Sequence, residues 1–187
     1  MNGFKIPTKS NLKSRSSTID NAFVISITPW KKPTDAEFQE MLSKLELDEQ
    51  QCGYCLSGSS SADHFFPLVA NKNPTGYITE ISNLVPCCGS CNSSKGGKHW
   101  KSWYLSIETH DRLINSGVTE EKYKQRLKIL ESYEKIERTK LNYEKIVGKE
   151  KWQEYLNRKQ KMNDLLKEDQ SFCDELLKEI NAFLLKK

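Results

Sequence analysis

The apolar and polar positions of the first 49 residues predict two elements. Residues 22–28, Ala-Phe-Val-Ile-Ser-Ile-Thr, are a short β-branched run, which is typical of a strand. Thr34 or Asp35 can cap a helix that runs to about Leu47. The apolar positions of that helix recur at helical spacing on one face: Phe38, Met41, Leu42 and Leu45. Residues 1–18 are polar and lack a periodic pattern, and we expect a mobile arm there.

The middle of the chain carries shorter patterns. Asp63 and His64 precede the apolar run Phe-Phe-Pro-Leu-Val, which places them at the end of a predicted strand. Residues 77–81 predict a second strand. We expect a helix to begin near Cys91 or Asn92, with a first turn weakened by Gly-Gly at 96–97. This predicted helix carries four large side chains: Lys95, Lys98, Trp100 and Trp103.

The remainder of the chain is predicted to be helical. Thr119 caps a segment whose apolar residues recur at helical spacing up to Ile136, and Gly148 indicates a break. From Lys149 onward a long apolar stripe alternates with Lys and Glu. Its members are Trp152, Tyr155, Leu156, Met162, Leu165, Leu166, Phe172, Leu176, Ile180 and Phe183. The stripe favours an amphipathic helix packed on its own domain, and the alternative is a helix that dimerises.

Composition narrows the class of protein. The chain has 187 residues and a formal net charge of +4, and it contains no apolar run of the roughly 18 residues that a membrane span needs. The N-terminus has basic residues but no apolar stretch typical of a signal peptide, so we expect a cytoplasmic protein. In a reducing compartment, six cysteines indicate metal binding rather than disulfides.

The distribution of charge favours a polyanionic partner. Residues 1–34 contain six cations and one acid, and residues 52–104 contain four lysines and two acids. A basic arm and an acid-poor middle segment are typical of proteins that bind nucleic acid. The alternative is that the surplus lysines only keep the protein soluble.

Four cysteines have the spacing of a zinc site. Two Cys-x-x-Cys pairs, Cys52/Cys55 and Cys88/Cys91, can close one tetrahedral zinc centre. Gly53 between the first pair would let backbone amides point at a thiolate. Cys87 and Cys173 are then free thiols. Cys87 competes with Cys88 as a ligand, and the knuckle spacing favours Cys88.

A second group of polar residues is not needed by a zinc knot. Asp63 and Asn92 offer a carboxylate and an amide oxygen, which suit Mg²⁺ with open positions for a phosphodiester. His64 is the natural general base because its ring titrates near neutral pH. Asn83 can bond across the loop and so orient His64. Lys95 is either a phosphate contact or an ordinary helix-surface lysine, and both alternatives stay open.

These motifs together resemble a known family. Cys-x-x-Cys, Asp-His, Asn-Leu-Val-Pro and Cys-x-x-Cys-Asn-x-x-Lys-Gly occur in that order over residues 50–104, and they are similar to the HNH endonucleases of ββα-metal fold. The resemblance implies a catalytic Mg²⁺ or Mn²⁺ ion on Asp63 and Asn92, His64 as general base, and Asn83 as the family's central asparagine. It also implies structural zinc on Cys52, Cys55, Cys88 and Cys91. The last position is often His in the family and is Asn92 here.

The sequence therefore predicts an α+β protein in three segments. Residues 1–49 form an arm, strand and helix, 50–106 a zinc-stapled ββα-metal nuclease core, and 107–187 a helical region for DNA binding or dimerisation. The expected activity is hydrolysis of double-stranded DNA to 5′-phosphate and 3′-hydroxyl ends by a small restriction-type enzyme, with a homodimer cutting both strands. Two alternatives are a monomeric nicking enzyme of phage or intron type and a non-catalytic zinc module that binds nucleic acid or protein.

Overall fold

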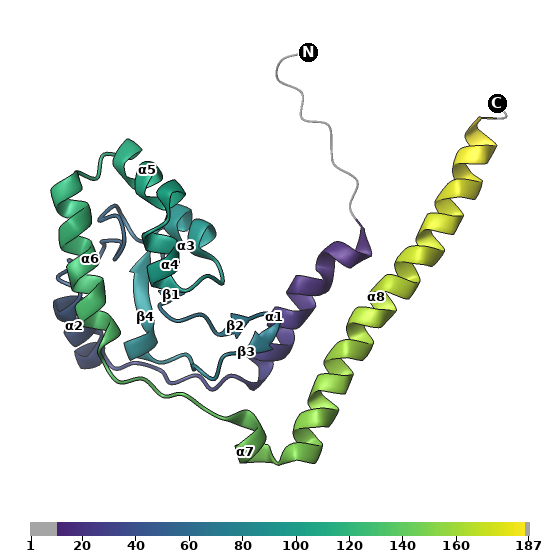
Figure 1. The fold of residues 1–187 in the computed structure, drawn as a ribbon, viewed down its shortest axis with the longest axis horizontal. Coiled ribbons are helices and arrows are strands. Elements are labelled where there is room, and N and C mark those ends of the chain that lie inside the picture. Colours follow the sequence, from purple (N-terminus) through teal and green to yellow (C-terminus); the bar gives the residue numbers. More distant parts are fainter. Residues whose placement is uncertain (1–10, 186–187) are drawn as a thin grey trace. The chain divides into compact units, whose positions relative to one another are not determined.

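The computed structural model describes residues 11–185 and shows a mixed α+β protein (Figure 1). The chain divides into two compact units, one formed by Met1–Ser26 with Tyr143–Lys187 and the other by Ile27–Asn142. This division differs from the three predicted segments, because residues 27–49 and 107–142 belong to the central unit. No helix among the described residues has the length and apolar character that crossing a membrane requires.

The terminal unit is entirely helical in its described part. A 3₁₀ turn, η1 (Leu12–Arg15), leads into α1 (Ser16–Ile27), and α7 (Tyr143–Val147) precedes α8 (Lys149–Leu184). The strand predicted at 22–28 is therefore wrong. Tertiary contacts override the β-branched composition, since Asp20 accepts a hydrogen bond of 2.9 Å from Asn163 and the Phe23 ring meets that of Tyr155.

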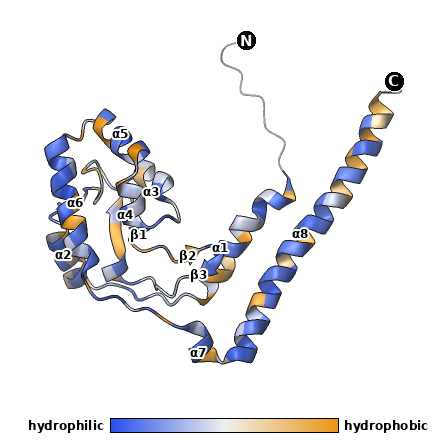
Figure 2. Cartoon of the chain, viewed as in Figure 1, coloured by the Kyte–Doolittle hydropathy of each residue, from blue (hydrophilic) through white to orange (hydrophobic). Residues whose placement is uncertain are grey.

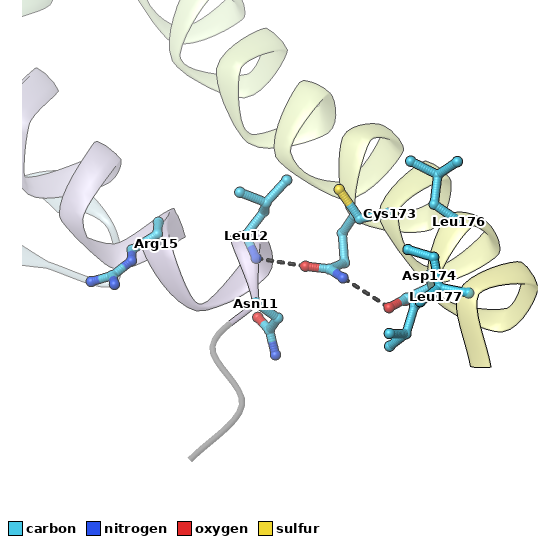
Figure 3. Close-up of a pocket in the computed structure, with 9 residues that line it drawn as sticks. Asn11, Leu12, Arg15, Cys173, Asp174, Leu176 and Leu177 are labelled. Atoms are coloured by element: carbon cyan, nitrogen blue, oxygen red, sulfur yellow. Dashed lines mark hydrogen bonds between the residues drawn. The ribbon is translucent and has the colours of Figure 1, made fainter. Parts of the chain in front are cut away.

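The long helix α8 begins after Gly148, whose φ of +86° confirms the predicted break. The apolar residues of its stripe differ in their exposure to solvent. Trp152, Tyr155, Leu156 and Leu166 are half-buried, whereas Phe172, Leu176, Ile180 and Phe183 are exposed, so apolar patches remain visible along α8 (Figure 2). The N–H of Leu12 donates to Gln170 at 2.6 Å, and a groove of about 610 Å³ lies beside this contact (Figure 3). The predicted packing of α8 on its own unit therefore extends at least to Gln170, whereas several apolar residues beyond it are exposed.

The central unit contains two small antiparallel sheets. β1 (Ser61–His64) pairs with β4 (Leu84–Cys87), and β2 (Val69–Ala70) pairs with β3 (Asn73–Pro74). The second strand predicted at 77–81 is wrong, because Tyr77 and Thr79 form only isolated bridges. The strand lies at 84–87 instead. A proline is tolerated there because β4 has only one partner strand, and the Pro86 carbonyl accepts from Gly53 N at 2.7 Å.

Six further helical elements complete the central unit: α2 (Asp35–Lys44), η2 (Ile81–Asn83), α3 (Gly89–Lys95), α4 (Trp100–Tyr104), α5 (Ile107–Asn115) and α6 (Glu120–Glu134). Thr34 caps α2 in a capping box with Glu37, and Thr119 caps α6, as predicted. The single helix expected near 91–103 is two helices, because Gly96 adopts a φ of +50° and ends α3.

Aromatic rings and one buried arginine form the core of this unit. Phe65 stacks on Trp100 at 4.9 Å between ring centroids, and both are fully buried. Arg126 of α6 is 2% exposed and donates to the carbonyls of Gly53 and Leu45, at 2.7 and 2.6 Å. The guanidinium thus ties α6 to the end of α2 and to the turn that carries the first cysteine pair.

We expect Arg126→Leu to lower the free energy of unfolding by about 2–4 kcal/mol, because two buried carbonyls lose a charged donor. Urea unfolding followed by circular dichroism measures the change. Lys124→Leu, on the exposed side of the same helix, is the control and should change stability by less than about 0.5 kcal/mol. Equal stability of the two variants would contradict a structural role for Arg126.

Candidate metal centre and the Asp63 site

Four cysteine sulfurs lie together in the central unit. The Sγ atoms of Cys52, Cys55, Cys88 and Cys91 are all within 4.8 Å of one another, and those of Cys55 and Cys88 are 3.7 Å apart. A zinc ion with four Zn–S bonds of about 2.3 Å in tetrahedral geometry separates its sulfurs by about 3.8 Å. The four cysteines could therefore bind a metal ion such as zinc, and they are the four predicted from the sequence.

The backbone around the sulfurs is fixed by two close approaches. Gly53 donates its N–H to Pro86 rather than to a thiolate, and a Cβ at this position would collide with the Val85 side chain. Glycine is therefore needed for contact with β4, not for the amide geometry expected from the sequence. Cys88 caps α3, and its Sγ accepts from the N–H of Cys91 at 3.4 Å.

A cation and a fifth thiol adjoin the cluster. Both terminal nitrogens of Arg112 lie 3.7 Å from the Cys91 sulfur, where the guanidinium offsets thiolate charge. Cys87 is buried beside Cys52 but is not one of the four clustered ligands, which agrees with the choice of Cys88. Neighbouring thiols that donate to Cys52 lower its pKa, and donation to Cys52 raises the pKa of Cys87 and of Cys91.

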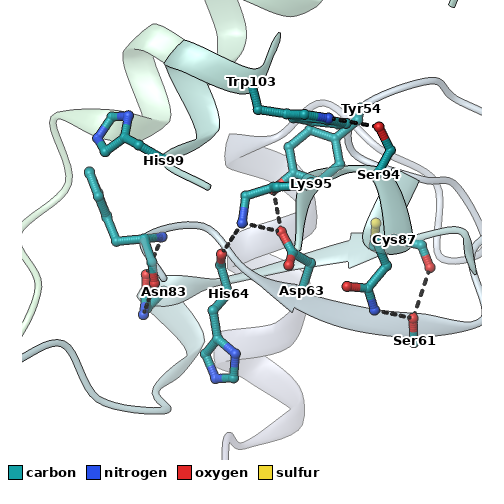
Figure 4. Close-up of polar contacts among 12 residues, drawn as sticks. Tyr54, Ser61, Asp63, His64, Asn83, Cys87, Ser94, Lys95, His99 and Trp103 are labelled. Carbon is teal, nitrogen blue, oxygen red and sulfur yellow. Dashed lines mark hydrogen bonds and ion pairs between the residues drawn. The ribbon is translucent and has the colours of Figure 1, made fainter. Parts of the chain in front are cut away.

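The Asp63 carboxylate is 6% exposed and has two protein partners (Figure 4). Tyr54 donates its hydroxyl to Asp63 Oδ2 at 2.8 Å, and Lys95 Nζ lies 2.9 Å from the same oxygen. Burial and the charge of Asp63 raise the pKa of Tyr54, so this phenol remains a donor. Lys95 also donates to the carbonyl of His64 at 2.7 Å. The ammonium is thus a bridge between α3 and the end of β1.

Asn92 lies on the same face of β1 as Asp63. Its Nδ2 donates to the Ser61 hydroxyl at 3.4 Å, and Ser61 shares a face with Asp63 because the two are two residues apart on a strand. Among the described residues no hydrogen bond reaches Oδ1 of Asp63 or Oδ1 of Asn92. Two hard oxygen donors from neighbouring elements therefore remain for a cation such as Mg²⁺.

The ring of His64 points away from the Asp63 carboxylate (Figure 4), as adjacent strand residues do. Its Nε2 lies 2.9 Å from the Thr79 hydroxyl, and no described residue bonds to Nδ1. Burial lowers the pKa of His64, the charge of Asp63 opposes this shift, and Lys95 adds to it. The ring is therefore neutral at neutral pH, with one nitrogen held and the other free. Asn92 thus lies beside Ser61 on the face of β1 that carries Asp63, whereas the His64 ring leaves the strand on the other face (Figure 4).

Asn83 is fully buried and bonds across the loop, as the sequence predicts. Its Oδ1 accepts from the N–H of Phe66 at 2.9 Å, and its Nδ2 donates to the carbonyls of Phe66 and Ile78, each at 3.1 Å. Its own carbonyl accepts from the N–H of Phe65 at 2.8 Å. Asn83 thereby fixes the backbone that leaves His64 and touches no group that could react.

Lys95 is neither of the two alternatives expected for it. Lys95 is 1% exposed and its ammonium lies 2.9 Å from Asp63 Oδ2, so it is not a surface group. Trp100 and Trp103 are buried in the core. His99 caps α4, and His110 is paired with Asp111 and Glu120 on the surface.

Three partners were not anticipated from the sequence. Ser61 could have been found from its i−2 relation to Asp63 on the predicted strand. Tyr54 lies inside the first knuckle, and Thr79 reaches His64 from a segment 15 residues away, for which the sequence offers no signal.

Comparisons with protein-family models, with curated proteins and with solved structures found no match for this chain.

Purified protein is expected to contain one zinc ion per chain, and Cys91→Ser is expected to reduce this content severely because a site with three sulfurs holds zinc more weakly. Elemental analysis by inductively coupled plasma mass spectrometry measures the ratio. Cys87→Ser and Cys173→Ser are matched controls, and both should keep one zinc. Loss of zinc in Cys87→Ser would instead assign Cys87 as a ligand in place of Cys88.

Lys95→Met is expected to destabilise the protein by about 3–5 kcal/mol, because it leaves the Asp63 charge buried without its partner. The double variant Asp63→Asn/Lys95→Met removes both charges and should recover part of that loss. Denaturant unfolding of both proteins measures the difference. The exposed Lys98→Met is the control, and a Lys95→Met protein as stable as this control would show that the ion pair contributes little.

Proposed function

We propose that this protein is a metal-dependent DNA endonuclease of the HNH type, with β1, β4 and α3 as its zinc-stapled ββα-metal core. The observation that carries the proposal is the shared face of Asp63 and Asn92, two residues whose side-chain Oδ1 atoms accept no hydrogen bond from residues 11–185. A non-catalytic zinc site needs neither residue there. The motif order over residues 50–104 supports the same proposal, although no family model matches the chain.

The chemistry assigned to the residues is hydrolysis of a phosphodiester. A divalent ion such as Mg²⁺ or Mn²⁺ bound at Asp63 and Asn92 would supply charge neutralisation at the phosphate and stabilise the leaving 3′ oxygen. Water attacks phosphorus, the P–O3′ bond breaks, and the products are a 5′-phosphate and a 3′-hydroxyl. Lys95 holds the other oxygen of the Asp63 carboxylate in place, at 2.9 Å.

His64 is assigned as general base through Nδ1, because Thr79 already holds Nε2. Its ring and the Asp63 carboxylate leave opposite faces of β1, whose last residue is His64. A phosphodiester that meets both groups must therefore lie across the end of the strand. The neutral ring favoured by burial is the form that accepts a proton from water.

A second candidate function is a zinc module that binds DNA or protein without cutting. One observation favours it: Asp63 is 6% exposed and already contacts Tyr54 and Lys95. A buried ion pair of this kind is also found where a structure only needs to satisfy a charge. Such a protein would retain DNA but would not nick it in the presence of Mg²⁺ or Mn²⁺.

The flanking segments suggest a restriction-type enzyme that cuts both strands as a homodimer, rather than a monomeric nicking enzyme. About 80 residues follow the proposed core, and α8 exposes apolar residues in its last turns. Sedimentation of the protein with and without duplex DNA separates the two forms.

Supercoiled plasmid DNA incubated with the protein and Mg²⁺ should be converted to nicked and linear forms. His64→Ala is expected to slow this conversion by about 10²–10⁴-fold, which is the usual contribution of a general base, with zinc content unchanged. Asp63→Asn should also slow it by removing the charged ligand. Gel electrophoresis measures the rates, and sequencing of the ends reports the end chemistry.

The matched control is His110→Ala, which removes a histidine paired with two acids on the surface and should leave cleavage unchanged. Cleavage at the parent rate by His64→Ala would remove the base assignment while leaving the metal site. A zinc-loaded parent that binds plasmid but cuts with neither Mg²⁺ nor Mn²⁺ would favour the second candidate function.

A further inference from the structure

An exposed tryptophan, Trp30, is paired with Thr79, and the Thr79 side chain contacts the His64 ring. The segment that enters the central unit pairs with residue 79 in a parallel bridge between Trp30 and Thr79. The N–H of Lys31 donates to the Thr79 carbonyl at 2.9 Å, and the N–H of Thr79 donates to the Pro29 carbonyl at 3.1 Å. Residues paired across a bridge present their side chains on the same side of the ladder. The Trp30 indole therefore lies on the side from which the Thr79 hydroxyl reaches the His64 ring, at 2.9 Å.

The backbone under Trp30 is held firmly although its ring is not. Lys31 Nζ is 2.9 Å from Glu80 Oε2, and Glu80 also accepts from Thr139 N at 2.6 Å. Glu80 is 8% exposed, so the anchor is built into the unit. The Trp30 side chain is nevertheless 65% exposed, in contrast to the buried Trp100 and Trp103. A large aromatic ring on an anchored backbone, open to solvent, is available to stack on a base or a sugar.

The charges next to Trp30 favour a polyanion. Glu80 is occupied by Lys31 and Thr139, so the ion pair leaves little free negative charge at this point. The following residue, Lys32, is exposed, and no described residue pairs with its ammonium. A cation beside an exposed indole is suited to a phosphate next to a sugar or base.

We infer that Trp30 and Lys32 form a DNA contact adjacent to the cutting site, where the indole packs on a sugar or base beside the scissile phosphate and the ammonium binds a phosphate. This inference rests on the proposed nuclease function and names how that site holds its substrate. The contact fixes a phosphodiester across the end of β1, the position that Asp63 and His64 together require.

The experiment uses the full chain carrying His64→Ala, so that DNA is bound but not cut. Fluorescence anisotropy with a fluorescein-labelled 40-base-pair duplex of mixed sequence, in Mg²⁺, gives the dissociation constant. Adding Trp30→Ala is expected to weaken binding about tenfold, which is typical of losing one aromatic contact to a base. Lys32→Gln is expected to weaken binding and to reduce the slope of affinity against salt by about one charge.

Two controls match these changes. Ile107→Ala removes an exposed apolar side chain elsewhere in the unit, where Ile107 is 76% exposed, and Lys122→Gln removes an exposed lysine of α6. Neither should change binding by more than about twofold. Trp30→Phe keeps an aromatic ring and should retain most of the affinity. Zinc content and thermal melting of each variant show that the unit is still folded.

The outcomes separate this inference from the proposed function. If the parent binds and cuts DNA while Trp30→Ala binds as tightly as Ile107→Ala, the inference is overturned and the nuclease function stands. If the His64→Ala parent does not bind duplex DNA at all, both are overturned. If Trp30→Ala abolishes a dimer in sedimentation without changing binding per site, the indole is an interface between two copies and the inference is likewise overturned.

Discussion

The four-sulfur cluster is the constraint on which the geometry of the central unit depends. β1 and β4 contain four residues each, and a two-stranded ribbon of this length is marginal in water. The cluster joins the turn at Cys52–Cys55 to the first residues of α3. Its sulfurs are already spaced for a tetrahedral ion, so binding needs little rearrangement. With the ends of α3 and of the turn fixed, Asn92 and Lys95 are set against β1 as well.

Because the cysteine cluster positions α3, it also positions Lys95, the cation that pairs with the Asp63 carboxylate. A carboxylate that is 6% exposed needs a partner, and Lys95 supplies one at 2.9 Å from a position that is itself 1% exposed. Both protein contacts use Oδ2, so the two oxygens of one carboxylate have different environments. A cation at Oδ1 would share Asp63 with the ammonium. The ion pair is therefore compatible with a metal site, but it limits the charge that Asp63 can offer to a cation.

The sequence was sufficient for features that depend on local spacing. The cysteine pairs, the caps at Thr34 and Thr119, the break at Gly148 and the buried amide of Asn83 all depend on neighbouring residues or on tight stereochemistry. The sequence did not predict secondary structure that depends on contacts between residues distant in the chain. Residues 22–27 belong to helix α1, which contacts α8 through Phe23–Tyr155 and Asp20–Asn163. Residues 84–87 form the strand despite Pro86, since β1 needs a partner and Pro86 occupies a position without a ladder donor.

The sequence suggests which residues belong to the candidate site but not the direction in which their side chains point. Asp63 and His64 are neighbours on a strand, so their side chains leave opposite faces, and the sequence alone does not say what each face meets. Cys91 and Asn92 are neighbours on a helix, where successive side chains differ by about 100°. That rotation sends a sulfur to the soft-metal cluster and leaves the next amide beside Ser61. One short helix thus presents a thiol and an amide oxygen at adjacent positions on different faces, so a soft metal at the cysteines would not compete for the oxygen that the proposed nuclease function assigns to a hard cation.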